Sequence, residues 1–258
     1  MSNSRKQAPL SKDEIQKMRI ACNMAAKVLN HTSQFAKAGI TTDELDKIAD
    51  DFTKSIGGTS ACIGYHGYPK ATCISVNEVV CHGLPGAYKI KDGDILNIDV
   101  TVFKDGFFGD TSKTVMVGKV SKNASDLVDA AYQAMMVGIQ AITPNGYTGD
   151  IGFETNKYVT RRGYSTVKEI GGHGIGRIFH GDPFVPAYGK KGKGERIIPW
   201  TCFTVEPMVN EGTDEFTEVS IPNSDIKYYI TADKKLSAQF EHTVLITDTG
   251  YEILTLDE

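Results

Sequence analysis

The chain has 258 residues, 40% hydrophobic and 23% charged, with a net charge of −4, which describes an ordinary globular protein long enough for a buried core. The weak negative charge provides no field for nucleic acid or anionic lipid, and no apolar run is long enough for a signal peptide or a membrane span. Its five cysteines are odd in number, irregularly spaced and without a Cys-x-x-Cys pair, which argues against a disulfide framework or a thiolate zinc site and indicates reduced thiols in the cytoplasm.

Two capping boxes mark the first two helices. We expect residues 1–10, which are polar, to be flexible. The first helix should open at the Ser-Lys-Asp-Glu box of residues 11–14 and the second at the Thr-Thr-Asp-Glu box of residues 41–44, since apolar residues recur at helical spacing behind both. Short strands are expected around residues 60–65 and 71–76.

A β-hairpin carries the first two candidate ligands. Apolar side chains alternate along residues 95–102, which leaves Asp99 and Thr101 on the opposite face. An Asp-Gly turn at residues 105–106 would place Thr101 opposite Asp110. Asp99 and Asp110 would then be diagonal neighbours, and a divalent cation bound by both would remove their repulsion. The alternative is a pair of solvated carboxylates on an exposed face.

The second half of the chain repeats the plan of the first. A long helix should end before Pro144, a shorter one should run over residues 148–162, and strands should return at 202–206 and 240–246. The glycine- and lysine-rich residues 188–195 indicate a solvated loop, because no helix follows them as a phosphate cradle requires.

Helix, helix, strands and hairpin therefore occur twice in the same order. We predict one α+β domain over residues 11–258, with two pseudo-symmetric halves at about 11–120 and 121–258 around a central antiparallel sheet. No Pro/Gly-rich linker separates the halves.

Two histidines lie in a glycine-rich stretch. His173 is surrounded by the glycines of residues 171–176, which allow close backbone approach but lack the spacing of a nucleotide-binding loop. His180 follows the apolar residues 178–179. A lone histidine is more often structural than catalytic, but two in such a stretch favour a functional site.

Two glutamates occupy unusual positions within strand patterns. Glu206 ends the run 203–205 and precedes Pro207, and Glu241 lies inside the run 237–244. Glutamate is rare in strands and seldom buried unpaired. The alternative explanation is a salt bridge to a buried lysine or arginine, although neither segment contains one.

Four carboxylates and one imidazole together form an oxygen-rich ligand set for two divalent cations: Asp99, Asp110, His173, Glu206 and Glu241. Such a set suits Mn, Fe, Co or Zn, and magnesium also fits. Two ions about 3.5–4 Å apart would activate a bridging water and stabilise charge on a carbonyl oxygen. The sequence therefore predicts a two-metal hydrolase of amides.

The same residues lie in motifs that resemble the type I methionine aminopeptidases, which have the pita-bread fold. The resemblance covers nearly all of residues 12–258, and the motifs follow the family's order. They are GYHGYP at 64–69, NEVVCHG at 77–83, NIDVT at 97–101, GDTS at 109–112, GHGIG at 172–176, EPM at 206–208 and QFEH at 239–242.

The resemblance implies a role for each candidate. The five residues above would be the metal ligands, with Asp110 and Glu241 bridging both ions. Glu206 would shuttle a proton from the nucleophilic water to the leaving amine. His82 would contact the substrate backbone and assist catalysis, and His180 would bind the scissile carbonyl or the intermediate.

The resemblance also implies a methionine pocket and a further cation. The pocket would consist of Cys62, Tyr65, Tyr68, Cys73 and Phe179, whose aromatic and polarizable side chains suit a thioether. A monovalent cation would bind backbone carbonyls near Asn77, Val79 and Ser237.

The chain departs from the family pattern in two places. Trp200-Thr201-Cys202 stands where relatives carry Gly-Met-x. Lys227 stands where relatives carry a tryptophan over the pocket, with Tyr228 and Tyr229 beside it. The segment 211–229 is also longer than usual. Closure of the pocket therefore depends on other side chains.

We expect a cytoplasmic, monomeric enzyme that removes the N-terminal methionine from nascent polypeptides with a small second residue, in transient contact with the ribosome. Three alternatives stand beside it. Prolidases share the fold but carry an extra N-terminal domain, whereas the first predicted helix begins at residue 11 here. A non-enzymatic binding module would have lost metal ligands, and a metal-stabilised structural domain would not need His82 and His180.

Overall fold

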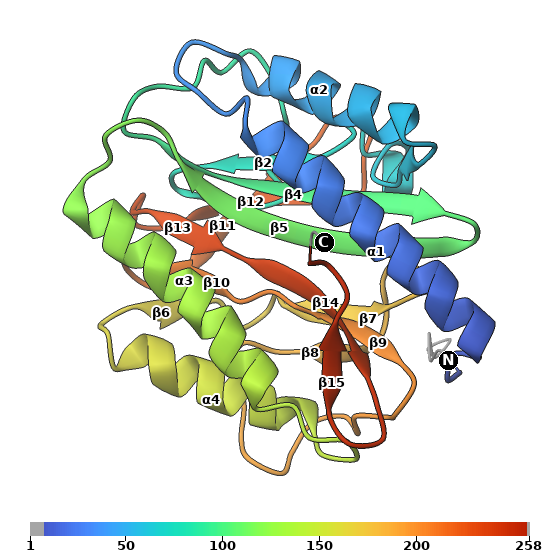
Figure 1. The fold of residues 1–258 in the computed structure, drawn as a ribbon. Coiled ribbons are helices and arrows are strands. Elements are labelled where there is room, and N and C mark those ends of the chain that lie inside the picture. The colour runs from blue at the N-terminus through green and yellow to red at the C-terminus, as the bar shows by residue number, and fades with distance from the viewer. Residues whose placement is uncertain (1–7, 257–258) are drawn as a thin grey trace.

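The computed structural model describes residues 8–256 as helices layered on antiparallel sheets (Figure 1). Its helices are α1 (Lys12–Ser33), α2 (Thr42–Ser55), α3 (Lys122–Gln140) and α4 (Thr148–Thr160). Both capping boxes are present: the Ser11 and Thr41 side chains accept from the backbones of Glu14 and Glu44, whose carboxylates accept in return. The four predicted helices are confirmed, and among the described residues none is long and apolar enough to cross a membrane.

The segment before α1 is only partly described. Residues 1–7 of the stretch that we expected to be flexible lie outside the described residues. Leu10 is buried, and its amide donates to the carbonyl of Trp200 at 2.7 Å. The flexibility of residues 1–10 therefore stays a prediction.

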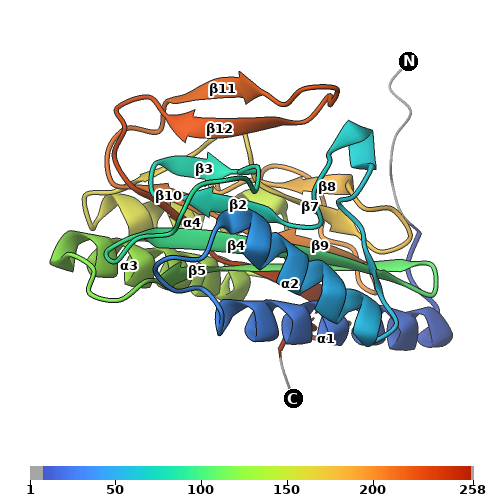
Figure 2. The same cartoon turned by 90° about the horizontal axis from the view of Figure 1, so that it is seen from above.

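A nine-stranded antiparallel sheet forms the centre of the molecule. Its strands are β1 (Thr59–Ser60), β2 (Cys73–Val76), β4 (Ile95–Lys104), β5 (Phe107–Met116), β7 (Gly172–Ile175), β8 (Gly181–Val185), β9 (Cys202–Val205), β14 (Glu241–Ile246) and β15 (Tyr251–Ile253). Their order is β1-β4-β5-β14-β9-β7-β8, with β2 paired to β4 and β15 paired to β14. Helices α1, α2 and α3 lie along one face of this sheet (Figure 2).

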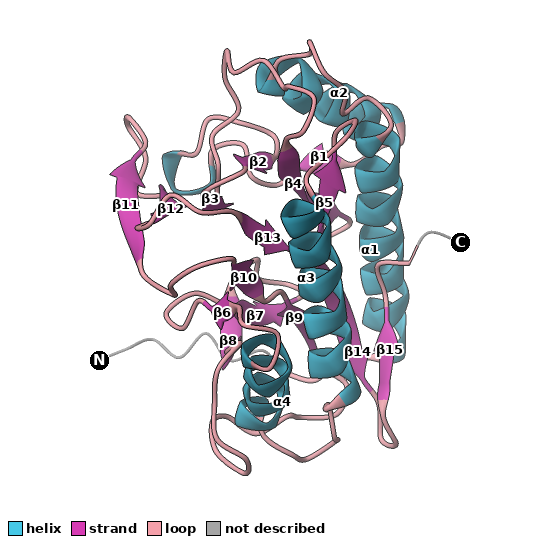
Figure 3. Cartoon of the chain, turned by 90° about the vertical axis from the view of Figure 1, so that its left-hand side faces the viewer, coloured by secondary structure: helices cyan, strands magenta, loops and turns pink. Residues whose placement is uncertain are grey.

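Two small sheets complete the fold. One contains β3 (Val79–Cys81), β11 (Phe216–Ser220) and β12 (Lys227–Thr231), and the other contains β6 (Ser165–Thr166), β10 (Met208–Asn210) and β13 (Ser237–Gln239). The hairpin of β11 and β12 lies on the side of the large sheet away from α1 and α3 (Figures 2 and 3). The large sheet is therefore enclosed between helices and this hairpin.

The hairpin of β4 and β5 has the predicted register. Asp105 and Gly106 both adopt positive φ, 49° and 88°, as a type I′ turn requires. Thr101 pairs with Asp110, and Asp99 pairs with Ser112, so the two aspartates are diagonal neighbours. The opposite, apolar face of β4 is buried in the core beneath α1 and α2.

The prediction of a strand at residues 60–65 is wrong. Only Thr59 and Ser60 pair with β4, and the chain then turns into a short 3-10 helix at Tyr65–Gly67. Gly64 and Gly67 have φ of 79° and 81°, a left-handed conformation that interrupts a strand. The turn replaces a strand with a projecting loop that carries Tyr65 towards the centre of the molecule.

The strand predictions for the second half are confirmed within one residue. The segment predicted at 202–206 is β9, which ends just before Glu206, and the segment at 240–246 is β14, which begins at Glu241. Residues 188–195 form a loop, as expected. Glu206 therefore lies just past the end of β9, whereas Glu241 is the first residue of β14 and pairs with Ser112 of β5.

Candidate metal centre and substrate cavity

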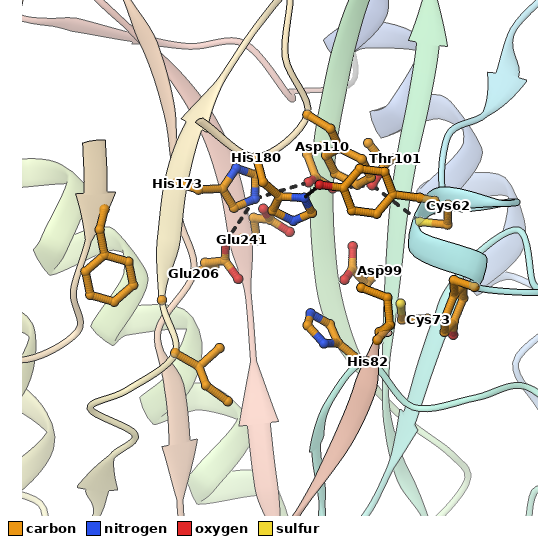
Figure 4. A pocket seen from close by; sticks show the side chains of 17 residues that line it. Cys62, Cys73, His82, Asp99, Thr101, Asp110, His173, His180, Glu206 and Glu241 are labelled. Carbon is orange, nitrogen blue, oxygen red and sulfur yellow. Dashed lines mark hydrogen bonds and ion pairs between the residues drawn. The ribbon is translucent and has the colours of Figure 1, made fainter. Parts of the chain in front are cut away.

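Five neighbouring strands of the large sheet each bring one predicted ligand to the same place (Figure 4). In sheet order, β4 carries Asp99, β5 carries Asp110, β14 begins with Glu241, β9 is followed directly by Glu206, and β7 carries His173. Adjacent antiparallel strands lie about 4.8 Å apart, so residues at matching heights converge although the sequence separates them widely.

The ligand atoms of Asp110, His173 and Glu241 all lie within 4.8 Å of one another. Nε2 of His173 is 3.7 Å from Oδ2 of Asp110 and 3.6 Å from Oε1 of Glu206. Asp99 lines the same cavity but stands outside the group of three. The arrangement accommodates a cation among the three residues and leaves Asp99 and Glu206 on its margins.

Hydrogen bonds hold two of the carboxylates in place. The hydroxyl of Thr101 donates to Asp110 at 2.9 Å, and that of Thr204 donates to Glu206 at 2.8 Å. The amide of Gln239 donates to the second oxygen of Glu206 at 3.0 Å. Sequence reasoning missed Thr204 and Gln239 as supports. The signal for Gln239 was its place in the same motif as Glu241, whereas nothing local marked Thr204.

Burial makes these carboxylates unusually basic. Desolvation raises the pKa of Asp99 to about 7 and of Glu206 to about 8. Desolvation, followed by the charges of neighbouring acids, raises the pKa of Asp110 and Glu241 well above the usual range. Neither solvated carboxylates nor salt bridges explain the cluster, because the described residues that line the cavity include no lysine or arginine. A divalent cation fits this donor set, since it would supply the missing positive charge.

His173 is held as a neutral ligand. Desolvation lowers its pKa to about 4, so the ring carries one proton near neutral pH. Nδ1 lies 3.3 Å from the carbonyl oxygen of Gly174, and a carbonyl can only accept, which places the proton on Nδ1. Nε2 therefore presents its lone pair towards Asp110 and Glu206, the state in which imidazole binds metals.

The acids open into a cavity of about 290 Å³ with a largely apolar lining. All five residues of the predicted methionine pocket line it: Cys62, Tyr65, Tyr68, Cys73 and Phe179. Lining residues that sequence reasoning missed are Thr101, Ile170, Gly171, Phe184 and Ile226. The exposed Lys227 pairs with Glu218 instead of covering the cavity, and its neighbour Ile226 takes that place.

His82 and His180 also line the cavity. His82 follows β3 with a φ of 55°, and its Nδ1 lies 3.1 Å from the carbonyl oxygen of Lys227. His180 directly precedes β8, and its Nδ1 lies 2.9 Å from the hydroxyl of Tyr65. Neither histidine belongs to the group of three ligands. Trp200 lies elsewhere, with its indole donating to Asp248 at 3.1 Å.

Comparisons with known proteins agree with this geometry. The model of metallopeptidase family M24 matches residues 16–248. Methionine aminopeptidase A of Synechocystis sp. is 47% identical over 250 residues, 96% of this chain and 97% of that protein. The crystal structure of methionine aminopeptidase from Rickettsia prowazekii superposes with a TM-score of 0.93 at 40% identity, covering 97% of this chain and 100% of that one. Prolidase from Pyrococcus furiosus shares the fold alone, with a TM-score of 0.78 at 20% identity over 97% of this chain and 66% of that one.

Proposed function

The chain belongs to metallopeptidase family M24, among its methionine aminopeptidases, and from this premise we propose that it cleaves N-terminal methionine by means of water activated between two divalent cations. The pita-bread fold expected from the sequence is confirmed by these relatives. The observation that carries the proposal is the convergence of four acids and one imidazole at the base of an apolar cavity. That arrangement combines a metal centre with space for one thioether side chain.

We assign the metal ligands as Asp99, Asp110, His173, Glu206 and Glu241. Asp110 and Glu241 would hold both cations, and their ligand atoms lie within 4.8 Å of each other and of that of His173. When bound, the cations would supply a Lewis acid for the scissile carbonyl and a nucleophilic water at neutral pH. Mn, Fe, Co and Zn all suit the donor set.

Three further side chains are proposed to act on the substrate. Glu206, whose pKa burial raises to about 8, is suited to take a proton and return it to the leaving amine near neutral pH. Nδ1–H of His82 donates to Lys227, which leaves Nε2 free to accept from a substrate N–H. His180 faces the same cavity and is assigned to the scissile carbonyl.

We also propose how the chain is organised, where the enzyme works and which further cation it binds. It is a single domain over residues 11–258 with halves at about 11–120 and 121–258. It acts as a cytoplasmic monomer on nascent chains, in transient contact with the ribosome. A monovalent cation is proposed near Asn77, Val79 and Ser237, where the amide of Ser237 donates to the carbonyl of Asn77 and the buried Ser237 hydroxyl has no hydrogen-bond partner within the described part of the chain.

The function is tested by release of methionine from Met-Ala-Ser and Met-Lys-Ser peptides. Metal-stripped protein would receive Mn, Fe, Co or Zn singly, with N-acetyl-Met-Ala-Ser as the matched control because it lacks the free amine. We expect metal-dependent cleavage of Met-Ala-Ser alone. Cleavage of the acetylated peptide would show an endopeptidase, and no cleavage despite bound metal would favour a non-enzymatic module.

A further inference from the structure

A hydrogen bond to the hydroxyl of Tyr65 bears directly on what the ring of His180 can do. Oη of Tyr65 lies 2.9 Å from Nδ1 of His180, and the ring centroids are 5.1 Å apart. We propose that Tyr65 is a positioning residue that acts through His180, donating its hydroxyl to Nδ1 and so holding the ring with its proton on Nε2. This rests on the proposed function, in which His180 serves the scissile carbonyl.

The tautomer follows from which groups can donate. A neutral imidazole has one N–H and one lone pair. A substrate carbonyl only accepts, so the productive ring must carry its proton on Nε2 and accept at Nδ1. A phenol hydroxyl can both donate and accept, so it can supply the donor that Nδ1 then needs, whereas a backbone carbonyl in its place would force the opposite tautomer.

His82 provides the contrast within the same cavity. The partner of its Nδ1 is the carbonyl oxygen of Lys227 at 3.1 Å, so its proton lies on Nδ1 and its Nε2 accepts. With Tyr65 as donor, His180 presents a hydrogen-bond donor while His82 presents an acceptor. A peptide bond offers one N–H and one carbonyl, and the two rings are complementary to that pair.

The structure holds Tyr65 firmly enough to act in this way. Its turn is closed by Gly64 N–H donating to Tyr68 O at 2.8 Å and Tyr68 N–H donating to Tyr65 O at 2.9 Å. The end of the β11–β12 hairpin clamps the turn from outside, since both the Asp225 amide and the Ser224 hydroxyl donate to the His66 carbonyl. A hydroxyl on a fixed turn loses little entropy when it orients a neighbour.

Packing alone does not fix which way round the imidazole of His180 lies, and the hydrogen bond with Tyr65 does. Phe179 stacks on the imidazole with centroids 4.1 Å apart and planes 22° apart, and Tyr65 packs against Phe179 at 4.7 Å. Stacking fixes the plane of the ring, but an imidazole flipped by about 180° around its Cβ–Cγ bond packs almost as well. That flip exchanges Nδ1 with a ring carbon, and a hydrogen bond at Nδ1 distinguishes the two orientations.

The kinetic test is Tyr65→Phe, which removes one oxygen and keeps the ring that lines the cavity. We expect kcat on Met-Ala-Ser to fall about tenfold, the value of one lost hydrogen bond, with KM unchanged within about twofold. In the His180→Ala background the same substitution should have no further effect on kcat. Tyr88→Phe is the matched control, since its hydroxyl donates to Asp94 at 2.9 Å away from the site. A rise in KM alone, or an equal fall in kcat in both backgrounds, would overturn the proposal.

A spectroscopic test does not depend on activity. In the metal-stripped protein labelled with 15N-histidine, NMR should show Nδ1 of His180 unprotonated, with assignment from the His180→Ala spectrum, and Tyr65→Phe should shift it towards the other tautomer. A protonated Nδ1 in the native protein would refute the proposal even if the enzyme is active. An inactive protein with the expected tautomer would refute the proposed function alone.

Discussion

The cavity has two walls that are built in different ways. The carboxylate wall, made of Asp99, Asp110, Glu206 and Glu241, rises from neighbouring strands of one sheet. The histidine wall, made of His82 and His180, projects from irregular segments that adjoin β3 and β8. The strands of the large sheet hold the first wall in position, whereas Nδ1 of His82 and Nδ1 of His180 each bond to a group outside that sheet, the carbonyl of Lys227 and the hydroxyl of Tyr65.

The difference indicates what each wall has to do. Buried acids repel one another, and only a rigid frame keeps them together until a cation neutralises them. Burial lowers the pKa of His82, and for a neutral imidazole what matters is which nitrogen holds the proton. The carboxylate wall should therefore respond to metal and pH, and the histidine wall to substrate.

The largest effect should come from Asp110→Asn in the carboxylate wall. The amide is a poor bridging ligand, so we expect bound metal to fall by at least one equivalent and kcat/KM to fall by about 10³-fold or more. Metal content by elemental analysis and methionine release would be measured together. Asp126→Asn, which breaks only an exposed pair with Lys122, is the control. Full metal content in the Asp110 variant would mean that this residue is not a ligand.

Replacing each histidine should show that the two walls have different roles. His82→Ala and His180→Ala should each lower kcat/KM by about 10²–10³-fold, the range of a general acid–base group or oxyanion donor. Both variants should keep the metal content of the native protein, because neither ring belongs to the ligand group. Metal loss in either variant would contradict the ligand assignment.

The two walls also differ in how far the sequence predicts them. An alternating strand and an Asp-Gly turn act locally, so the register that pairs Thr101 with Asp110 was predictable. The bond from Tyr65 to His180 joins residues 115 positions apart, and the glycine turn before it replaced a predicted strand. Ile226 took the place expected for Lys227 because the hairpin turns the lysine outward to Glu218. Motif resemblance named every residue of both walls but none of these contacts.

Metal-free protein should lose stability as pH rises from 6.5 to 8. Burial raises the folded-state pKa of Asp99 to about 7 and of Glu206 to about 8, so the folded protein binds more protons than the unfolded chain in this window and stability falls with pH. His173, with its pKa lowered to about 4, has the opposite effect, but only below about pH 6.5. We expect a loss of at least about 2 kcal/mol, because the raised pKa values of Asp110 and Glu241 act in the same direction.

Urea unfolding at both pH values in the presence of a chelator measures this loss. Added Mn should stabilise the protein more at pH 8 than at pH 6.5, because binding requires deprotonated carboxylates. Glu206→Gln should reduce the pH dependence in the chelator without abolishing it, since the amide does not titrate but Asp99 still does. A metal-free protein whose stability is constant or rises over this window would contradict the burial of unpaired acids.

The smallest effect should come from Thr204→Val, which tests whether the carboxylate wall is rigid because of the sheet alone. The hydroxyl of Thr204 donates to Glu206 at 2.8 Å and accepts from the amide of His173 at 3.0 Å, so it joins ligands from β9 and β7. Valine keeps the shape and removes both bonds, so we expect metal affinity to fall about tenfold, at the lower end for a residue that orients a ligand. Unfolding free energy should fall by about 1 kcal/mol. Thr217→Val, at an exposed position of β11, is the control. Unchanged metal affinity would mean that the strands alone position Glu206 and His173. The carboxylate wall would then need no side-chain hydrogen bonds for its geometry, whereas the histidine wall does.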